Sequence, residues 1–144
     1  MILGIDPGVK GAFALLDTRE NRVTCTDMPD TTAALVELIL NLPPLAFCVI
    51  EKPFYPQMIG IRNAAKIAEA YGAIKASLVW RGIPAHETRP AEWKAALGLS
   101  ASKSASREKA GMIFPDDAEQ WKLIKHDGRA EAALIAWYGK RWAA

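Results

Sequence analysis

Apolar runs of strand length alternate with polar turns in the first part of the chain. These runs cover residues 1–6, 12–17 and 22–27, and each is rich in apolar or β-branched residues. Pro7 and Gly8 are a turn signal after the first run, and a polar segment separates the second run from the third. Connections this short join neighbouring antiparallel strands. The pattern therefore predicts a meander of three antiparallel strands.

Apolar residues at helical spacing follow the meander, and two further strand-like segments lie between the helices. The first helix is expected to begin at Thr31 or Thr32, which can cap it, and to end before a Pro-Pro pair. The predicted helices cover residues 31–42, 61–81, 90–97, 104–114 and 128–142. The apolar run at 45–51 is predicted to be the fourth strand, and residues 83–88 are predicted to be a short fifth strand.

The order of these elements predicts an α/β fold. Three consecutive strands, followed by two strands that each come after a helix, predict a mixed five-stranded sheet with helices on both faces. The chain has 144 residues, which is enough for one hydrophobic core and too few for two. We therefore expect residues 1–144 to form a single domain.

Acidic residues stand at the carboxyl ends of two of the predicted strands. Asp6 ends the first strand and Glu51 ends the fourth. Ligand sites of open α/β sheets gather at the carboxyl ends of strands, so the two carboxylates converge if these strands are neighbours. Asp127 and Glu131 are four residues apart at the start of the last predicted helix, which places them on one helix face.

Carboxylates gathered in this way suit a divalent metal ion. Like charges repel, so a cluster of acids requires a compensating cation. Oxygen ligands without paired His or Cys favour Mg²⁺ or Mn²⁺ over Zn²⁺. Two such ions can activate a water molecule and stabilise the leaving oxygen of a phosphodiester. The alternative is structural, with Asp6 in an Asx turn, Asp127 as a helix cap and Glu131 in a solvated turn.

Three segments resemble the RuvC-type Holliday junction resolvases. The first strand and its turn read ILGIDPG over residues 2–8, with Gly11 and Ala14 following. The second segment reads VIEKPF over residues 49–54, and the third reads AEAALIA over residues 130–136. The resemblance keeps the order and spacing of the family over nearly the full length. Short loops are typical of its compact, phage-borne branch.

This resemblance implies an RNase H-like fold and an enzyme that resolves four-way DNA junctions by paired, symmetric nicks. It implies two Mg²⁺ ions per active site, replaceable by Mn²⁺, and the implied ligands are Asp6, Glu51, Asp127 and Glu131. The chain departs from the family at two positions: the last acid is Glu131 instead of Asp, and Gly128 stands where many members have Asp or His. Asp127 is then the expected fourth ligand, with His126 as the alternative.

Aromatic and basic residues near these acids are the expected DNA contacts. Phe54, in the loop after Glu51, would stack on an unpaired base, and Tyr55 is the neighbouring candidate. Packing of these rings onto the protein's own core is the alternative. The basic candidates for phosphate contacts are Lys10, Lys94, Lys103, Arg107, Lys109 and Lys125. Phosphate contacts position DNA without reading its sequence, whereas solvated helix faces would explain the same charges without DNA.

The family resemblance also implies a homodimer. The helix predicted over residues 61–81 carries more apolar surface than one contact face needs, and its Ala-rich turns allow close approach of another helix. We expect dimerisation through this helix, with burial against the sheet as the alternative.

Composition and chain length limit the other classes of function. The formal net charge is +2, which does not by itself indicate a nucleic-acid-binding protein. No apolar run approaches the ~20 residues that span a bilayer, and no signal peptide is evident, so we expect no membrane partner. Cys25 and Cys48 are expected to be reduced thiols, as in a cytoplasmic protein.

Three other functions share some of these features. Sugar- or acetate-kinase-like ATPases have a similar first strand, but they need two such domains around the nucleotide, and we therefore expect no nucleotide cofactor. An RNase H-like nuclease acting on RNA–DNA hybrids or flaps is a second alternative. A non-catalytic module that grips branched DNA or a partner protein is a third, which the departures at Gly128 and Glu131 favour.

Overall fold

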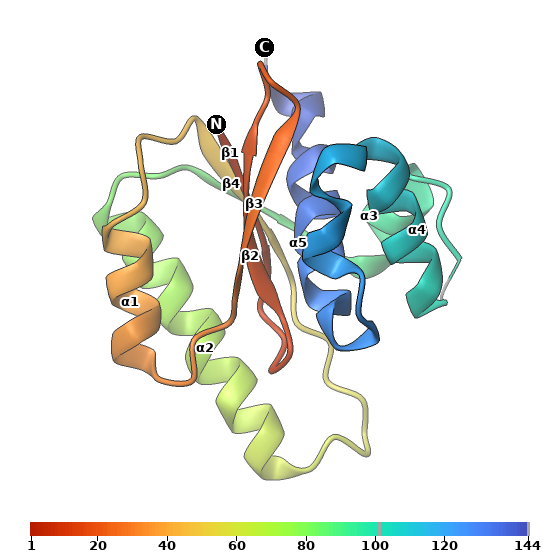
Figure 1. The fold of residues 1–144 in the computed structure, drawn as a ribbon. Helices are drawn as coiled ribbons and strands as arrows, with labels where there is room; N and C mark the ends of the chain where they lie inside the picture. The colour runs from red at the N-terminus through yellow and green to blue at the C-terminus, as the bar shows by residue number, and fades with distance from the viewer. Residues whose placement is uncertain (101, 144) are drawn as a thin grey trace.

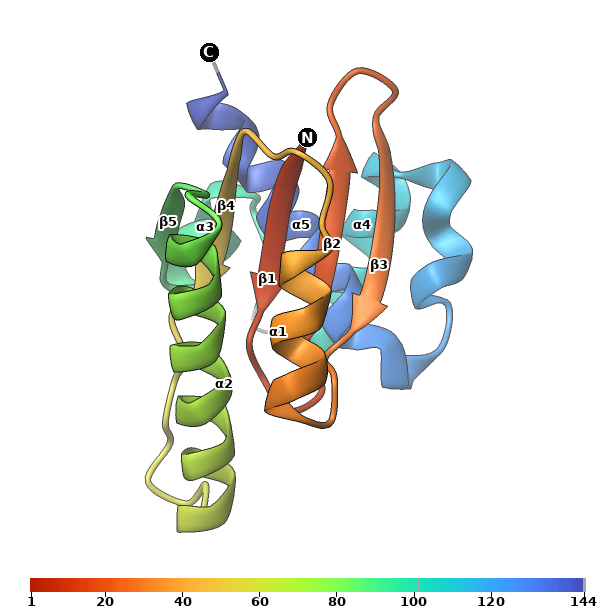
Figure 2. The same cartoon turned by 90° about the vertical axis from the view of Figure 1, so that its left-hand side faces the viewer.

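The computed structural model describes residues 1–100 and 102–143, and its centre is a five-stranded sheet with the order β3-β2-β1-β4-β5 (Figure 2). The strands are β1 (Ile2–Asp6), β2 (Ala12–Asp17), β3 (Arg22–Asp27), β4 (Phe47–Glu51) and β5 (Ala85–Thr88). β1 pairs antiparallel with β2 and parallel with β4, β2 pairs antiparallel with β3, and β4 pairs parallel with β5. The predicted mixed sheet is confirmed.

Helices cover both faces of this sheet (Figure 1). One face carries α1 (Thr32–Leu40) and α2 (Ile61–Trp80), which pack against each other. The other face carries α5 (Asp127–Tyr138), with α3 (Pro90–Ala96) and α4 (Lys103–Ile113) outside it. Two short 3₁₀ turns in the described residues, η1 (Pro115–Trp121) and η2 (Ile124–His126), lie between α4 and α5. A third, η3 (Gly139–Trp142), follows α5. No helix in the described residues has the length and apolar character to cross a membrane.

Strand β1 divides the core into two layers because its side chains alternate between the faces. Ile2 belongs to the cluster under α5, whereas Leu3 and Ile5 belong to the cluster under α1 and α2. Gly4 faces α5, and a Cβ atom added there would lie 2.2 Å from the carbonyl oxygen of Ala132. The missing side chain at Gly4 therefore lets α5 lie unusually close to the centre of the sheet.

The ends of several elements differ from the prediction. The first helix begins at Thr32 because Thr31 caps it, with the Thr31 hydroxyl accepting the Ala34 N–H at 3.2 Å. The last predicted helix, 128–142, begins one residue earlier and changes to a 3₁₀ turn after Tyr138. The 3₁₀ turn η1 was not predicted, because the contacts of Asp117 with Arg22 and with the Val23 N–H hold it in place. Such contacts leave no periodic signal in the sequence.

Candidate active site

The strand alternation places two acids on the face of the sheet that α5 covers. Asp6 continues the series of Ile2 and Gly4 along β1, and Glu51 continues the series of Phe47 and Val49 along β4. β1 and β4 are parallel neighbours, and their register pairs Ile5 with Ile50. Asp6 and Glu51 therefore lie side by side at the carboxyl edge of the sheet, as the sequence predicts.

Asp6 is held by the turn that follows it. Its Oδ1 atom accepts the N–H of Gly8 at 2.9 Å, which is an Asx turn. The turn is tight, because a Cβ atom on Gly11 would lie 2.0 Å from the carbonyl oxygen of Asp6. The structural alternative for Asp6 is therefore present, and it fixes the carboxylate at the mouth of the site.

Glu131 approaches the same place from α5. Its Oε1 atom lies 2.8 Å from the ammonium of Lys94 and accepts the hydroxyl of Ser106 at 3.3 Å. Burial, with a smaller contribution from the nearby Glu131 carboxylate, raises the pKa of Asp6 to about 6. Burial likewise raises the pKa of Glu51 to about 7, with Asp6 and Glu131 adding to the effect. The three carboxylates therefore repel one another across a shared site.

Asp127 is the fourth predicted acid and lies at the first residue of α5. It lines a hollow together with Asp6 and Glu131, and its Oδ1 atom forms an ion pair of 2.7 Å with Nε of Arg107. The charged neighbours of His126 are instead Arg129, Lys125 and Asp27, and burial lowers the pKa of its imidazole. Of the two residues, Asp127 is the one that lines the hollow with Asp6 and Glu131.

The packing around Gly128 leaves no space for a side chain at this position. A Cβ atom at this position would lie 2.1 Å from the carbonyl oxygen of Lys10 and 2.9 Å from Cα of Gly11. The start of α5 is pressed against the turn between β1 and β2, so no side chain fits there. An acid at position 128 would therefore clash with the backbone of this turn.

The donor set suits a hard divalent cation, although the acids are not yet arranged as ligands. In the part of the chain that the structure describes, no three side chains of His, Cys, Asp or Glu are grouped closely enough to hold one metal ion. Two of the carboxylates form ion pairs with cations of the protein itself: Glu131 with Lys94, and Asp127 with Arg107. Half-buried carboxylates with raised pKa values are still the oxygen donors that Mg²⁺ and Mn²⁺ favour. The residues present therefore fit such ions.

The predicted DNA contacts differ in their exposure and in the residues that they face. Phe54 and Tyr55 are 73% and 44% exposed, so their rings are not packed into the core, and Phe54 borders a hollow with Arg89 and Pro90. Lys10 and Lys125 line the hollow beside Asp6. Lys94 and Arg107 point to the acids, Lys109 lies half-buried on α4, and the side chain of Lys103 lies outside the described residues.

Trp93 and Ser106 are contacts of the acids that sequence reasoning missed. The indole N–H of Trp93 donates to Oε2 of Glu51, and Ser106 donates to Glu131. Trp93 and Glu51 are 42 residues apart in the chain, and Trp93 lies outside the three motif segments. The contact follows only from the packing of α3 at the edge of the sheet.

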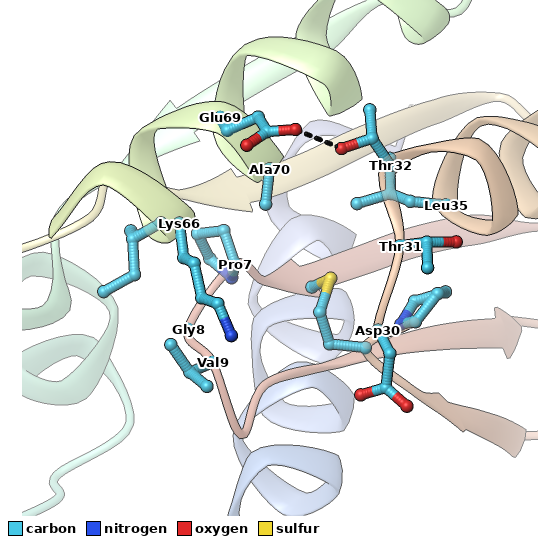
Figure 3. Close-up of a pocket in the computed structure, with 13 residues that line it drawn as sticks. Pro7, Gly8, Val9, Asp30, Thr31, Thr32, Leu35, Lys66, Glu69 and Ala70 are labelled. Atoms are coloured by element: carbon cyan, nitrogen blue, oxygen red, sulfur yellow. Dashed lines mark hydrogen bonds between the residues drawn. The ribbon is translucent and has the colours of Figure 1, made fainter. Parts of the chain in front are cut away.

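A third hollow lies on the other side of the Pro7-Gly8 turn (Figure 3). Its volume is about 250 Å³, and it is bordered by the loop before α1 and by the first half of α2. Glu69 accepts the hydroxyl of Thr32 there, and the side chain of Lys66 extends toward Gly8 (Figure 3). The acids of this hollow are Asp30 and Glu69, not the four predicted ligands.

Comparison with known proteins relates the chain to solved structures alone, because no protein-family model and no curated protein matches it. RuvC of Thermus thermophilus in complex with a Holliday junction substrate has 17% sequence identity and a TM-score of 0.67, covering 98% of this chain and 94% of that chain. A second T. thermophilus RuvC structure has 17% identity and a TM-score of 0.66, covering 99% and 96%. A yeast mitochondrial Holliday junction resolvase has 16% identity and a TM-score of 0.60, covering 98% and 78%. The chain therefore has the RNase H-like fold of RuvC.

Proposed function

We propose that this protein is a divalent-metal-dependent endodeoxyribonuclease that resolves four-way DNA junctions by paired, symmetric nicks. The observation that carries the proposal is the convergence of Asp6, Glu51 and Glu131, from three distant segments, at the carboxyl edge of an RNase H-like sheet. The choice of substrate is supported by two of the proteins with this fold, one solved with a Holliday junction substrate and one named as a Holliday junction resolvase.

Asp6, Glu51 and Glu131, with Asp127 as the fourth, would hold two Mg²⁺ ions. When bound, such ions lower the pKa of a water molecule and stabilise the leaving oxygen of the phosphodiester. The protein contributes preorganisation, because the Gly8 N–H fixes Asp6. It also contributes cations, since Lys94 and Arg107 compensate the negative charges of Glu131 and Asp127. Mn²⁺ would serve in place of Mg²⁺, because it accepts the same oxygen donors.

DNA would approach the carboxyl edge of the sheet along its basic and aromatic rim. Lys10 and Lys125, which line the hollow beside Asp6, would contact the phosphates that flank the cleaved bond. The exposed ring of Phe54 would stack on a base that is unpaired at the centre of the junction. These contacts recognise shape and strand opening rather than sequence.

Paired nicks on two strands require two active sites, and we propose that the protein is a homodimer. The face of α2 that points away from the sheet is apolar along the helix: its exposed residues are Ile61, Ala65, Ala68, Gly72, Ala76 and Val79. Ile61 is 90% exposed and Val79 is 79% exposed, which is unusual for large apolar side chains on a single face. Small residues between them allow the same helix of a second copy to approach closely.

Ala68→Glu is expected to convert the dimer to a monomer, because it places a charge at the centre of this face without touching the core. The matched control is Ala95→Glu, the same change at an exposed position of α3. Sedimentation equilibrium of wild type and both variants measures the effect. A wild type that sediments as a monomer, or an Ala68→Glu variant that remains dimeric, contradicts the proposed interface.

The proposed function is tested by cleavage of labelled substrates with the purified protein in Mg²⁺ and in EDTA. We expect cleavage of a four-way junction at symmetric positions, much slower cleavage of duplex, flap and RNA–DNA hybrid, and no cleavage in EDTA. Preferential cleavage of the hybrid would indicate an RNase H-like activity instead. Junction binding without any cleavage would indicate a non-catalytic module whose acids are permanently neutralised by Lys94 and Arg107.

A further inference from the structure

Helix α3 brings two consecutive side chains to two of the four acids. Trp93 donates its indole N–H to Oε2 of Glu51, and Lys94 forms an ion pair with Glu131. Lys94 is explained by its charge, since it compensates a carboxylate. Trp93 has no charge and no place in the mechanism above, and it is one of the largest fully buried side chains of the protein.

The contact between Trp93 and Glu51 is specific in chemistry as well as in shape. Indole has a single polar atom, which only donates, and a carboxylate only accepts when it is ionised. Trp93 is 0% exposed, so water does not compete for its N–H group. The bond takes up Oε2 of Glu51 and restricts the rotation of the carboxylate. Oε1, which this bond leaves free, then has both of its lone pairs to offer to a metal ion.

The backbone around Trp93 is fixed to the same strand end as Glu51. Glu51 is the register partner of Thr88 in β5, and the Lys52 N–H donates to the Thr88 carbonyl at 2.7 Å. Glu92 accepts both the Thr88 hydroxyl and the Arg89 N–H, which caps the start of α3. Trp93 thus approaches Glu51 from a helix that is anchored to the neighbouring strand, so the indole is held at a defined position.

We propose that Trp93 is a positioning residue for the metal site, and that its indole N–H holds Glu51 in the orientation that binds a divalent ion. The inference rests on the proposed function, because it takes Glu51 as a metal ligand. Partners of this kind, one step removed from the metal, typically change metal affinity or activity by about 10–100-fold when they are lost.

The test compares Trp93→Phe with Trp121→Phe. Phe keeps an aromatic ring at position 93 and removes the donor. Trp121 is a suitable control because it is also buried, at 2% exposure, and its indole N–H has no partner among the described residues. Binding of Mn²⁺ alone, measured by calorimetry, is expected to be about 10–100-fold weaker in Trp93→Phe and unchanged in Trp121→Phe. Cleavage by Trp93→Phe is expected to need correspondingly more metal, with junction binding in EDTA unchanged.

A second variant covers the case in which Trp93→Phe does not fold. A tryptophan analogue with sulfur in place of the indole N–H, introduced at position 93, keeps the full shape of the side chain and removes only the donor. Wild-type Mn²⁺ affinity in the analogue variant overturns the proposal, as do equal losses in Trp93→Phe and Trp121→Phe. A wild-type protein that binds no Mn²⁺ and cuts no junction counts against the proposed function itself. Mn²⁺ binding that depends on the indole N–H supports the role of Trp93 even if the substrate is another nucleic acid.

Discussion

Asp6→Asn and Glu51→Gln are each expected to slow junction cleavage by roughly 10³-fold or more, because a metal ligand contributes several kcal/mol to the transition state. Both substitutions keep the shape of the side chain and remove its charge. Asn at position 6 still offers an oxygen to the Gly8 N–H, so the turn is preserved. Single-turnover cleavage of a labelled four-way junction in saturating Mg²⁺ measures the loss.

Junction binding is the control for these two variants. Binding measured by gel shift in EDTA is expected to be unchanged, because the phosphate contacts come from other residues.

Folding stability should also change in these variants. Between pH 4 and 7 the metal-free folded protein keeps protons on Asp6 and Glu51, whereas the unfolded chain has released them. Its stability therefore falls as the pH rises through this window. At pH 8 Asp6→Asn should raise the metal-free free energy of unfolding by roughly 1–3 kcal/mol. Wild-type cleavage rates in both variants would show that these acids are not ligands.

Gly128→Asp, which places a second acid directly after Asp127, is expected to destabilise the protein by roughly 3 kcal/mol or more. The added Cβ atom would lie 2.1 Å from the carbonyl oxygen of Lys10, so α5 or the turn between β1 and β2 must move. That movement also displaces Asp6 and Glu131, and cleavage should fall with stability. Urea unfolding in EDTA measures the first effect.

Gly111→Ala is the matched control for the substitution at Gly128. Gly111 also lies in a helix, but nothing is within 4 Å of the place that its Cβ atom would take. Ala is the better helix former, so this variant should gain about 0.5–1 kcal/mol. A Gly128→Asp protein as stable as the wild type would mean that position 128 accepts a ligand after all, and that Asp127 need not be one.

Much of the sheet could be predicted from the sequence because its signals are local. The strand ends at Asp6, Asp17, Asp27, Glu51 and Thr88 agree with the structure, and those at Asp6, Asp17 and Glu51 directly follow apolar runs. The turn η1 was missed, because long-range hydrogen bonds such as those of Asp117 stabilise it rather than periodic apolar contacts. Local patterns cannot report contacts between residues that are far apart in the chain.

The candidate site was predictable for the acids and not for their partners. Asp6 and Glu51 could be placed together because strand alternation and parallel pairing determine where strand-end side chains lie. The sequence marked Lys94 and Arg107 as basic and therefore suggested contacts with DNA, whereas the structure pairs them with Glu131 and Asp127. Charge alone does not distinguish a cation that faces an acid of the same protein from one that faces solvent.

The closeness of β1 to α5 has a consequence for the protein during its synthesis. Gly4 packs directly on the backbone of Ala132, so one face of β1 is covered only after α5 has packed against it. Glu131 lies in that same helix. A nascent chain that has not yet released this helix from the ribosome has neither a closed core nor the third acid. Under the proposed function, fragments left by interrupted translation would therefore be unable to cut the DNA of the cell that makes them.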